Sequence, residues 1–149
     1  MRTKKISEIQ VSYRPKLIGT EKIETSANAY KYLISQFPRR TIGLQESFVA
    51  LYLNRANNIL GCHHSSIGGL SGTVADIRIL LAVALKSMAS KIIISHNHPS
   101  GNLYPSSADK EMTAKIKEAC RVMDIMLLDH IIVSPIGNKY FSFTDEGIL

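Results

Sequence analysis

The chain has 149 residues, the length of one ordinary domain, and its 45% hydrophobic and 20% charged residues allow a buried core and disfavour a disordered chain. No apolar run approaches the ~20 residues of a membrane span, and no apolar stretch follows the basic start, so we expect a cytoplasmic protein without membrane contact. The two isolated cysteines, Cys62 and Cys120, exclude a disulfide scaffold. The net charge of +6 lies entirely in residues 1–40, because residues 41–149 carry nine basic and nine acidic residues.

The first half of the chain predicts three strands and one helix. Residues 9–14 alternate apolar and polar side chains, as a half-buried strand does, and residues 25–37 carry an apolar stripe at helical spacing. Residues 48–53 form a second strand, and a third returns from Ile59 after a turn. Residues 66–72 contain three glycines and are expected to form a loop.

The second half begins with a capping box, in which Thr73 caps a helix and the Asp76 carboxylate follows three residues later. The apolar pattern then predicts a buried strand, a helix and two further strands, over residues 91–95, 107–123, 125–134 and 139–143. The alternation of strands and helices fits an α/β domain with a mixed β-sheet flanked by helices.

A polar stretch after the buried strand carries the candidate chemistry. His96 and His98 are two residues apart at the end of an extended segment, so they project to the same side. Pro99 then turns the chain, and Asp109 falls in the first turn of the next helix, where the helix dipole favours a carboxylate. Because a strand end and a helix start can lie side by side, we expect these three side chains to share one ion.

Two imidazoles and one carboxylate suit Zn²⁺, and Fe²⁺ or Mn²⁺ also accept such a set. Three protein ligands leave one position to water, whose pKa a catalytic zinc lowers to about 7. Each fragment alone has a plainer meaning, since His-x-His is often a polar loop and Ser106 with Asp109 is an ordinary capping box. The combination of the fragments is what favours a metal site.

The same residues carry a resemblance to a known family. The pattern His-x-His-Pro-x6-Ser-x2-Asp resembles the metal signature of the JAB/MPN (JAMM) metalloprotease superfamily, with a match at His96, His98, Pro99, Ser106 and Asp109. Residues 96–101 and 129–133 resemble the RadC-like branch in particular. The similarity begins at about Glu46, so we interpret residues 41–149 as a RadC-like JAB/MPN domain. Residues 1–40, a basic strand and helix, are placed in the same unit.

The resemblance implies a three-layer α/β fold related to cytidine deaminases and one Zn²⁺ ion held by His96, His98 and Asp109. It implies an enzyme, a metal-dependent hydrolase that cleaves a peptide or isopeptide amide bond in a peptide or protein substrate. The family's upstream glutamate falls on Glu46, which would act as the general base. Ser106 would donate a hydrogen bond to the metal-bound water or to the oxyanion.

Deamination itself is not expected, because the His-x-Glu and Pro-Cys-x-x-Cys motifs of that reaction are missing. Two alternatives stay open. One is a nucleic-acid-binding module associated with DNA repair, in which basic residues 1–40 contact DNA, although such a segment is also typical of a solvated face. The other is a metal-bearing scaffold without turnover. The sequence indicates neither the substrate nor the oligomeric state.

The remaining histidines have simpler interpretations. His63 and His64 are adjacent on a predicted strand and point to opposite faces, which disfavours a shared ion. His130 follows Asp129 in a buried strand region and is expected to be structural, with an outer hydrogen bond to a metal ligand as the alternative.

Overall fold

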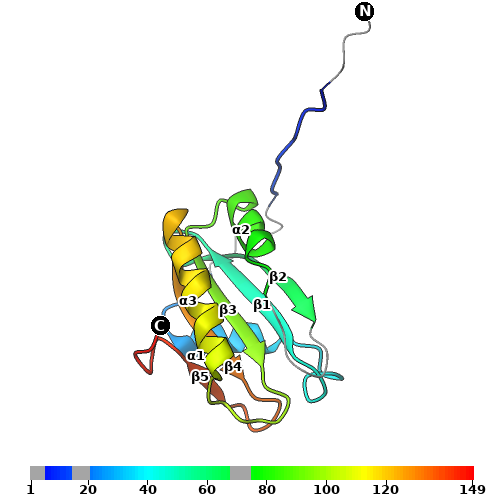
Figure 1. Ribbon diagram of the computed structural model, residues 1–149, viewed down its shortest axis with the longest axis vertical. Coiled ribbons are helices and arrows are strands. Elements are labelled where there is room, and N and C mark those ends of the chain that lie inside the picture. Colours follow the sequence, from blue (N-terminus) through cyan, green and yellow to red (C-terminus); the bar gives the residue numbers. More distant parts are fainter. Residues whose placement is uncertain (1–5, 15–20, 68–74) are drawn as a thin grey trace, which may run out of the picture.

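The computed structural model describes residues 6–14, 21–67 and 75–149. These residues form one five-stranded sheet of order β2-β1-β3-β4-β5, with three helices around it (Figure 1). In chain order the elements are α1 (Ser26–Ile34), β1 (Ser47–Leu53), β2 (Ile59–Ile67), α2 (Ile77–Lys86), β3 (Lys91–Asn97), α3 (Ser107–Val122), β4 (Met126–Val133) and β5 (Tyr140–Ser142). Strands β3 and β4 run parallel and the other pairs antiparallel, so the α/β fold with a mixed sheet is confirmed.

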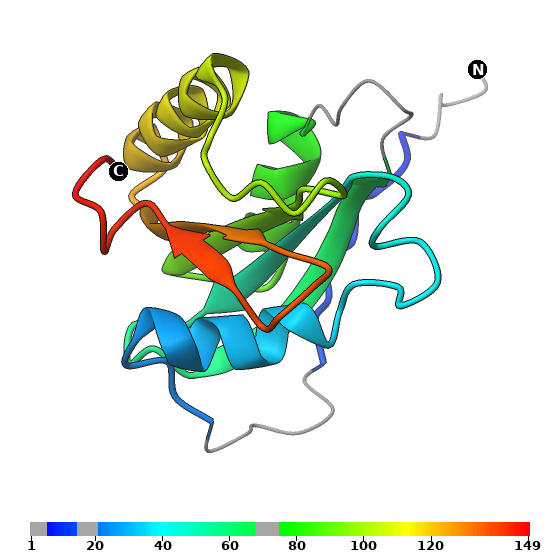
Figure 2. The same ribbon diagram turned by 90° about the horizontal axis from the view of Figure 1, so that it is seen from below.

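The sheet is covered on both faces, which gives three layers. Helix α1 lies on one face, and α2 and α3 lie on the other (Figure 2). Alternation along β1 explains this arrangement, because Ala50 and Tyr52 pack on the side of α2 and α3 while Val49 and Leu51 pack on the side of α1. The central strands are therefore buried on both sides, as their continuous apolar sequences predict.

The helix starts agree only partly with the sequence. Thr25 caps α1 by accepting a hydrogen bond from the Asn28 main-chain N–H, as predicted. Asp76, and not an earlier residue, is the N-cap of α2, since its carboxylate accepts from the main chain of Arg78. Thr73 lies outside the described residues. A carboxylate can serve as either end of a capping box, and the sequence does not say which role it takes.

The strand predicted over residues 9–14 is wrong. This segment is extended but pairs with no strand in the described part of the chain, and it leads away from the sheet (Figure 1). Ile9 and Val11 are exposed, and the segment touches the body where the Tyr13 hydroxyl donates to the main-chain oxygen of Leu60. An alternating pattern needs a neighbouring strand before it becomes a ladder, and the pattern alone does not supply one.

Other boundaries move by a few residues. Helix α1 ends at Ile34, before the expected end at Phe37. Ser66 and Ile67, assigned to a loop, are instead the last residues of β2, and residues 68–74 lie outside the described part. Within the described residues, no helix has the length and apolar character needed to cross a membrane.

The two cysteines differ in environment, which gives a direct test of the fold. Cys62 on β2 is exposed, whereas Cys120 on α3 is buried, and burial raises the pKa of the Cys120 thiol to about 11. We expect a water-soluble maleimide to label Cys62 in the native protein and both thiols in urea, as measured by intact mass. Cys62→Ser should abolish native labelling. Equal native labelling of both thiols would contradict this packing.

Candidate metal centre

The candidate site lies where β3 ends and α3 begins. His96 is the penultimate residue of β3 and is only 2% exposed, and His98 follows the strand directly. Ser106 is the N-cap of α3, which places Asp109 in the first turn of the helix with its side chain beside both imidazoles. The expected juxtaposition of a strand end and a helix start is therefore present.

The distances between the three donor groups suit a small tetrahedral ion. Asp109 Oδ1 lies 3.3 Å from His96 Nε2, and Asp109 Oδ2 lies 3.3 Å from His98 Nε2. The two Nε2 atoms are 2.9 Å apart. Ligand bonds of about 2.0–2.1 Å give a tetrahedron with edges of roughly 3.3 Å. One potential ligand atom from each of His96, His98 and Asp109 lies within 4.8 Å of the other two. In the described part of the chain, these residues form the group of metal-binding residue types that meets this limit.

A chain of hydrogen bonds fixes which nitrogen of His96 faces the site. The Thr113 hydroxyl donates its one hydrogen to the main-chain oxygen of Asp109, at 2.6 Å, so its oxygen accepts from His130 Nδ1, also at 2.6 Å. His130 is fully buried, and burial holds its pKa well below the ordinary value, which keeps the ring neutral. Its Nε2 is then an acceptor, and His96 Nδ1 donates to it at 2.8 Å. The His96 Nε2 lone pair therefore faces Asp109 and His98.

His98 is oriented in a similar way by a simpler contact. Its Nδ1 lies within hydrogen-bond distance of the main-chain oxygen of Asn102, which can only accept, so Nδ1 carries the hydrogen. The Nε2 lone pairs of His96 and His98 then point toward each other and toward a carboxylate. Such an arrangement is repulsive unless positive charge lies between the groups. Converging lone pairs and a carboxylate are the ligands that a divalent cation binds.

The electrostatics of the site agree with this conclusion. Burial alone would raise the pKa of the Asp109 carboxyl, but hydrogen bonds from His96 and His98, which form when these rings are protonated, hold that pKa far below the usual range. Burial would lower the pKa of His98, yet the hydrogen bond that the protonated ring donates to Asp109, the bond to the Asn102 carbonyl, and the negative charges of Asp109 and Glu46 raise it. Both shifts have one cause, because the site attracts positive charge, whether a proton or a metal ion.

Glu46 approaches the site through the register of the sheet. Strand β1 runs antiparallel to β3 with Phe48 opposite His96, so the residues just before β1 lie beside the residues at the end of β3. Glu46 is half-buried, and its charge acts on His98. The structure thus brings Glu46 to the cluster formed by His96, His98 and Asp109.

Asn97 holds the segment that carries Glu46. It is fully buried and points away from the two histidines that flank it, because successive strand residues face opposite sides. Its Oδ1 accepts from the main-chain N–H of Ser47 at 2.6 Å, and its Nδ2 donates to the carbonyls of Ile42 and Gln45 at 2.7 and 2.9 Å. One side chain therefore fixes residues 42–47 against the end of β3.

Ser106 is placed by the capping box of α3. Its hydroxyl oxygen accepts from the Asp109 main-chain N–H at 3.1 Å, and the Asp109 carboxylate accepts from the Ser106 main-chain N–H at 2.8 Å. The same carboxylate thus closes the capping box and faces the imidazoles. The hydroxyl hydrogen of Ser106 is left to donate elsewhere.

Sequence reasoning missed two residues and underrated a third. Asn97 was read only as part of a motif, although its place between two ligand candidates on a strand puts it on the opposite face. Thr113 gave no signal beyond its position one turn after Asp109. His130 was expected to be structural, and it contacts His96 directly, which was the alternative. His63 and His64 lie on the edge strand β2 and are not part of the cluster.

Comparison with known proteins agrees with this geometry. A family model described as the RadC-like JAB domain matches residues 23–148. The chain belongs to the RadC-like JAB family. The match begins before α1, earlier than the similarity first expected from Glu46, so that helix is part of the family domain.

Several relatives of this RadC-like chain are named only as UPF0758 proteins. One from Flavobacterium johnsoniae is 38% identical over 135 residues, which cover 89% of this chain and 56% of the relative. One from Streptococcus gordonii is 48% identical over 102 residues, or 68% of this chain and 44% of the relative. One from Streptococcus suis is 38% identical over 145 residues, or 97% and 54%. The chain spans about half the length of the curated relatives it matches.

If the cluster binds a divalent ion, Thr113→Val should weaken that binding by about 10- to 100-fold, because the near-isosteric change removes the group that fixes the His130 and His96 rings. Chelator competition measures the affinity, and ¹⁵N chemical shifts of the histidine rings report the tautomers. Thr144→Val is the matched control, since the Thr144 hydroxyl bonds the main-chain oxygen of Leu128 outside the site. Equal affinity in the two variants would show that the hydrogen-bond chain does not orient His96.

Asn97→Ala should destabilise the fold by about 2 to 4 kcal/mol, because it leaves a buried N–H and two carbonyls without partners. Urea unfolding measures the loss. The content of any bound metal should stay unchanged, since the candidate ligand atoms belong to other residues. Asn58→Ala is the control, because that side chain makes no hydrogen bond within the described part of the chain. The three hydrogen bonds of the Asn97 side chain to residues 42–47 are called the Asn97 clamp. An Asn97→Ala protein as stable as the parent would refute the role of this clamp.

Proposed function

We propose that this chain is a metal-dependent hydrolase that cleaves a peptide or isopeptide amide bond. The observation that carries the proposal is the convergence of two imidazole Nε2 lone pairs and one carboxylate on a common point, with a second carboxylate, Glu46, nearby. A structural metal site is usually closed by four protein ligands, and among the described residues three converge here. An open position is what a hydrolytic site needs.

In this proposal His96, His98 and Asp109 hold one Zn²⁺ ion. When bound, the ion would supply a water of lowered pKa and polarise the substrate carbonyl. The choice of zinc is supported by the mixed imidazole and carboxylate donors and by donor distances that suit a tetrahedron.

Glu46 is proposed as the general base. It takes a proton from the attacking water and gives it to the nitrogen of the leaving amine. The water oxygen becomes part of the new carboxylate, the carbon–nitrogen bond breaks, and the amine departs with the proton. The support for this role is the position of Glu46 at the start of β1, held by the Asn97 clamp, together with its electrostatic effect on His98.

Ser106 is proposed to donate a hydrogen bond to the oxygen that becomes negative as the carbonyl is attacked. Its hydroxyl oxygen already accepts from the Asp109 main chain, which orients the group and leaves its hydrogen available. A donor fixed before the reaction stabilises the developing charge without reorganising.

Glu46→Gln should retain one equivalent of Zn²⁺ and lose cleavage activity by about 10²- to 10⁴-fold, because only proton transfer is removed. His98→Ala should lose both zinc and activity. Elemental analysis measures the metal, and mass spectrometry of a peptide library derived from a bacterial proteome measures cleavage. Glu111→Gln, a change of an exposed glutamate on α3, is the control.

The two halves of the proposal fail separately. If His96→Ala holds as much zinc as the parent, the metal assignment is wrong. If Glu46→Gln cleaves as fast as the parent, the general base is wrong. A zinc-loaded parent that cleaves no peptide in the library would favour the scaffold alternative.

A further inference from the structure

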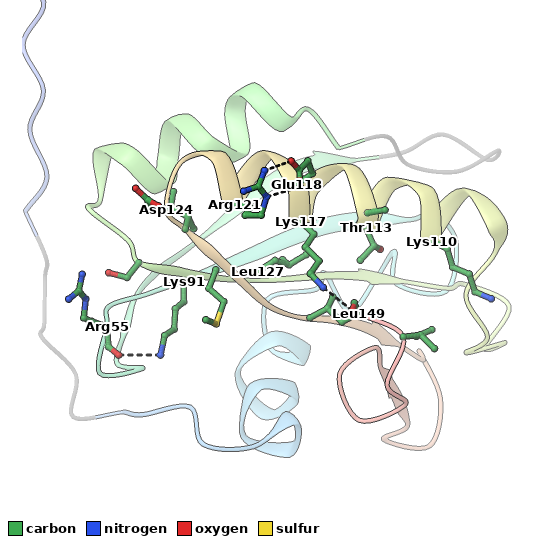
Figure 3. A pocket seen from close by; sticks show the side chains of 15 residues that line it. Arg55, Lys91, Lys110, Thr113, Lys117, Glu118, Arg121, Asp124, Leu127 and Leu149 are labelled. Carbon is green, nitrogen blue, oxygen red and sulfur yellow. Dashed lines mark hydrogen bonds and ion pairs between the residues drawn. The ribbon is translucent and has the colours of Figure 1, made fainter.

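A groove of about 720 Å³ runs along α3 on the side that faces the chain's last residues (Figure 3). Its walls come from one stripe of α3, the starts of β3 and β4, and the C-terminal segment. This volume lies within the range of roughly 300–1,000 Å³ that is typical of ligand-binding pockets. The groove shares none of its lining residues with the three metal-ligand candidates.

The floor of the groove is apolar. It is formed by Ile125, Met126 and Leu127, where β4 begins, and by Ile148 and Leu149. Met126 and Ile148 are 56% and 46% exposed, so large apolar side chains face solvent there. Ile125 and Leu127 are each only 5% exposed, so Met126 and Ile148 supply most of the accessible apolar surface. Exposed apolar side chains that gather at a groove are a mark of interaction sites.

The rim of the groove is basic. Five cationic side chains line it and only two carboxylates do: Arg55, Lys91, Lys110, Lys117 and Arg121 against Glu118 and Asp124. Figure 3 shows Arg121 paired with Glu118, whereas Lys117 points to the main-chain oxygen of Leu149. Lys91 donates to the Arg55 carbonyl and the Asn57 side chain. Among the described residues, therefore, only Arg121 of these cations has a side-chain carboxylate partner.

We propose that this groove binds an acidic peptide segment that also carries apolar side chains. The uncompensated cations match carboxylates, and the exposed floor matches apolar residues. From Lys110 to Arg121 the α3 stripe is about 16 Å long at 1.5 Å per residue. An extended peptide covers that length with about five residues at 3.4 Å each.

A nucleic acid fits these features less well. None of the described residues lining the groove is an aromatic on which bases could stack, and the two carboxylates would repel phosphates. Residues 1–5, 15–20 and 68–74, which lie outside the described part, contain no aspartate or glutamate and do not match the groove in charge. The proposal does not depend on hydrolysis, and the groove meets the candidate metal centre only at Thr113.

The test uses the full chain in EDTA, which separates binding from any cleavage. The probe is a fluorescein-labelled ten-residue peptide of alternating leucine and aspartate, followed by fluorescence anisotropy. We expect saturable binding that weakens by about tenfold in Lys117→Glu and in Met126→Asp, since each change removes one kind of contact. Lys31→Glu and Met88→Asp, which alter an exposed lysine on α1 and an exposed methionine after α2, should bind like the parent.

Three outcomes would overturn the proposal. The first is absence of binding by the parent protein. The second is equal weakening by groove and control variants, which would indicate attraction by net charge alone. The third is tighter binding of a single-stranded DNA of ten nucleotides than of the peptide, with sensitivity to Lys117→Glu and not to Met126→Asp, which would assign the groove to nucleic acid. Thermal unfolding of every variant confirms that each one is folded.

Discussion

The candidate site depends on hydrogen bonds made by the imidazole nitrogens that point away from it. His96 and His98 each have one nitrogen committed as a donor, to His130 and to the Asn102 carbonyl, and this leaves both Nε2 lone pairs directed at one point. The His130 partner is in turn fixed by Thr113, whose single hydrogen is already given to the main chain of Asp109. Hydrogen bonds to buried or main-chain groups therefore set the directions of the candidate ligand atoms.

The sheet register brings the other functional groups to the same place. Because β1 is antiparallel to β3, the segment before β1 lies beside the residues that end β3, and Asn97 fastens the two together with three hydrogen bonds. The candidate ligands and the candidate base therefore sit on one rigid unit, with α3 adding Asp109 from its first turn. This is the level of preorganisation that hydrolytic chemistry requires.

The sequence was sufficient for the elements with strong local signals. The apolar run in β3, the stripe of α3 and the spacing of His96, His98 and Asp109 each follow from period and turn chemistry. The contributions of Asn97 and Thr113 were not visible, because they depend on which strand lies beside β3 and on where α3 packs. The prediction of a strand at residues 9–14 is wrong for the same reason, since an alternating pattern forms a strand only beside the edge of another strand. The basic groove was not predicted because Arg55 and Lys91 join the three cations of α3 only in the folded chain.

The short span of chain between the donor groups has a thermodynamic consequence. The ligand candidates all lie between positions 96 and 109, so an ion bound by them would cross-link only a small loop. Closing a small loop removes little entropy from the unfolded chain, and each doubling of loop length would add only about 0.6 kcal/mol. The free energy of folding rests instead on the two apolar clusters on either side of the sheet. Any stabilisation that a bound ion adds would then come from its affinity for the folded protein and would grow with the concentration of the ion.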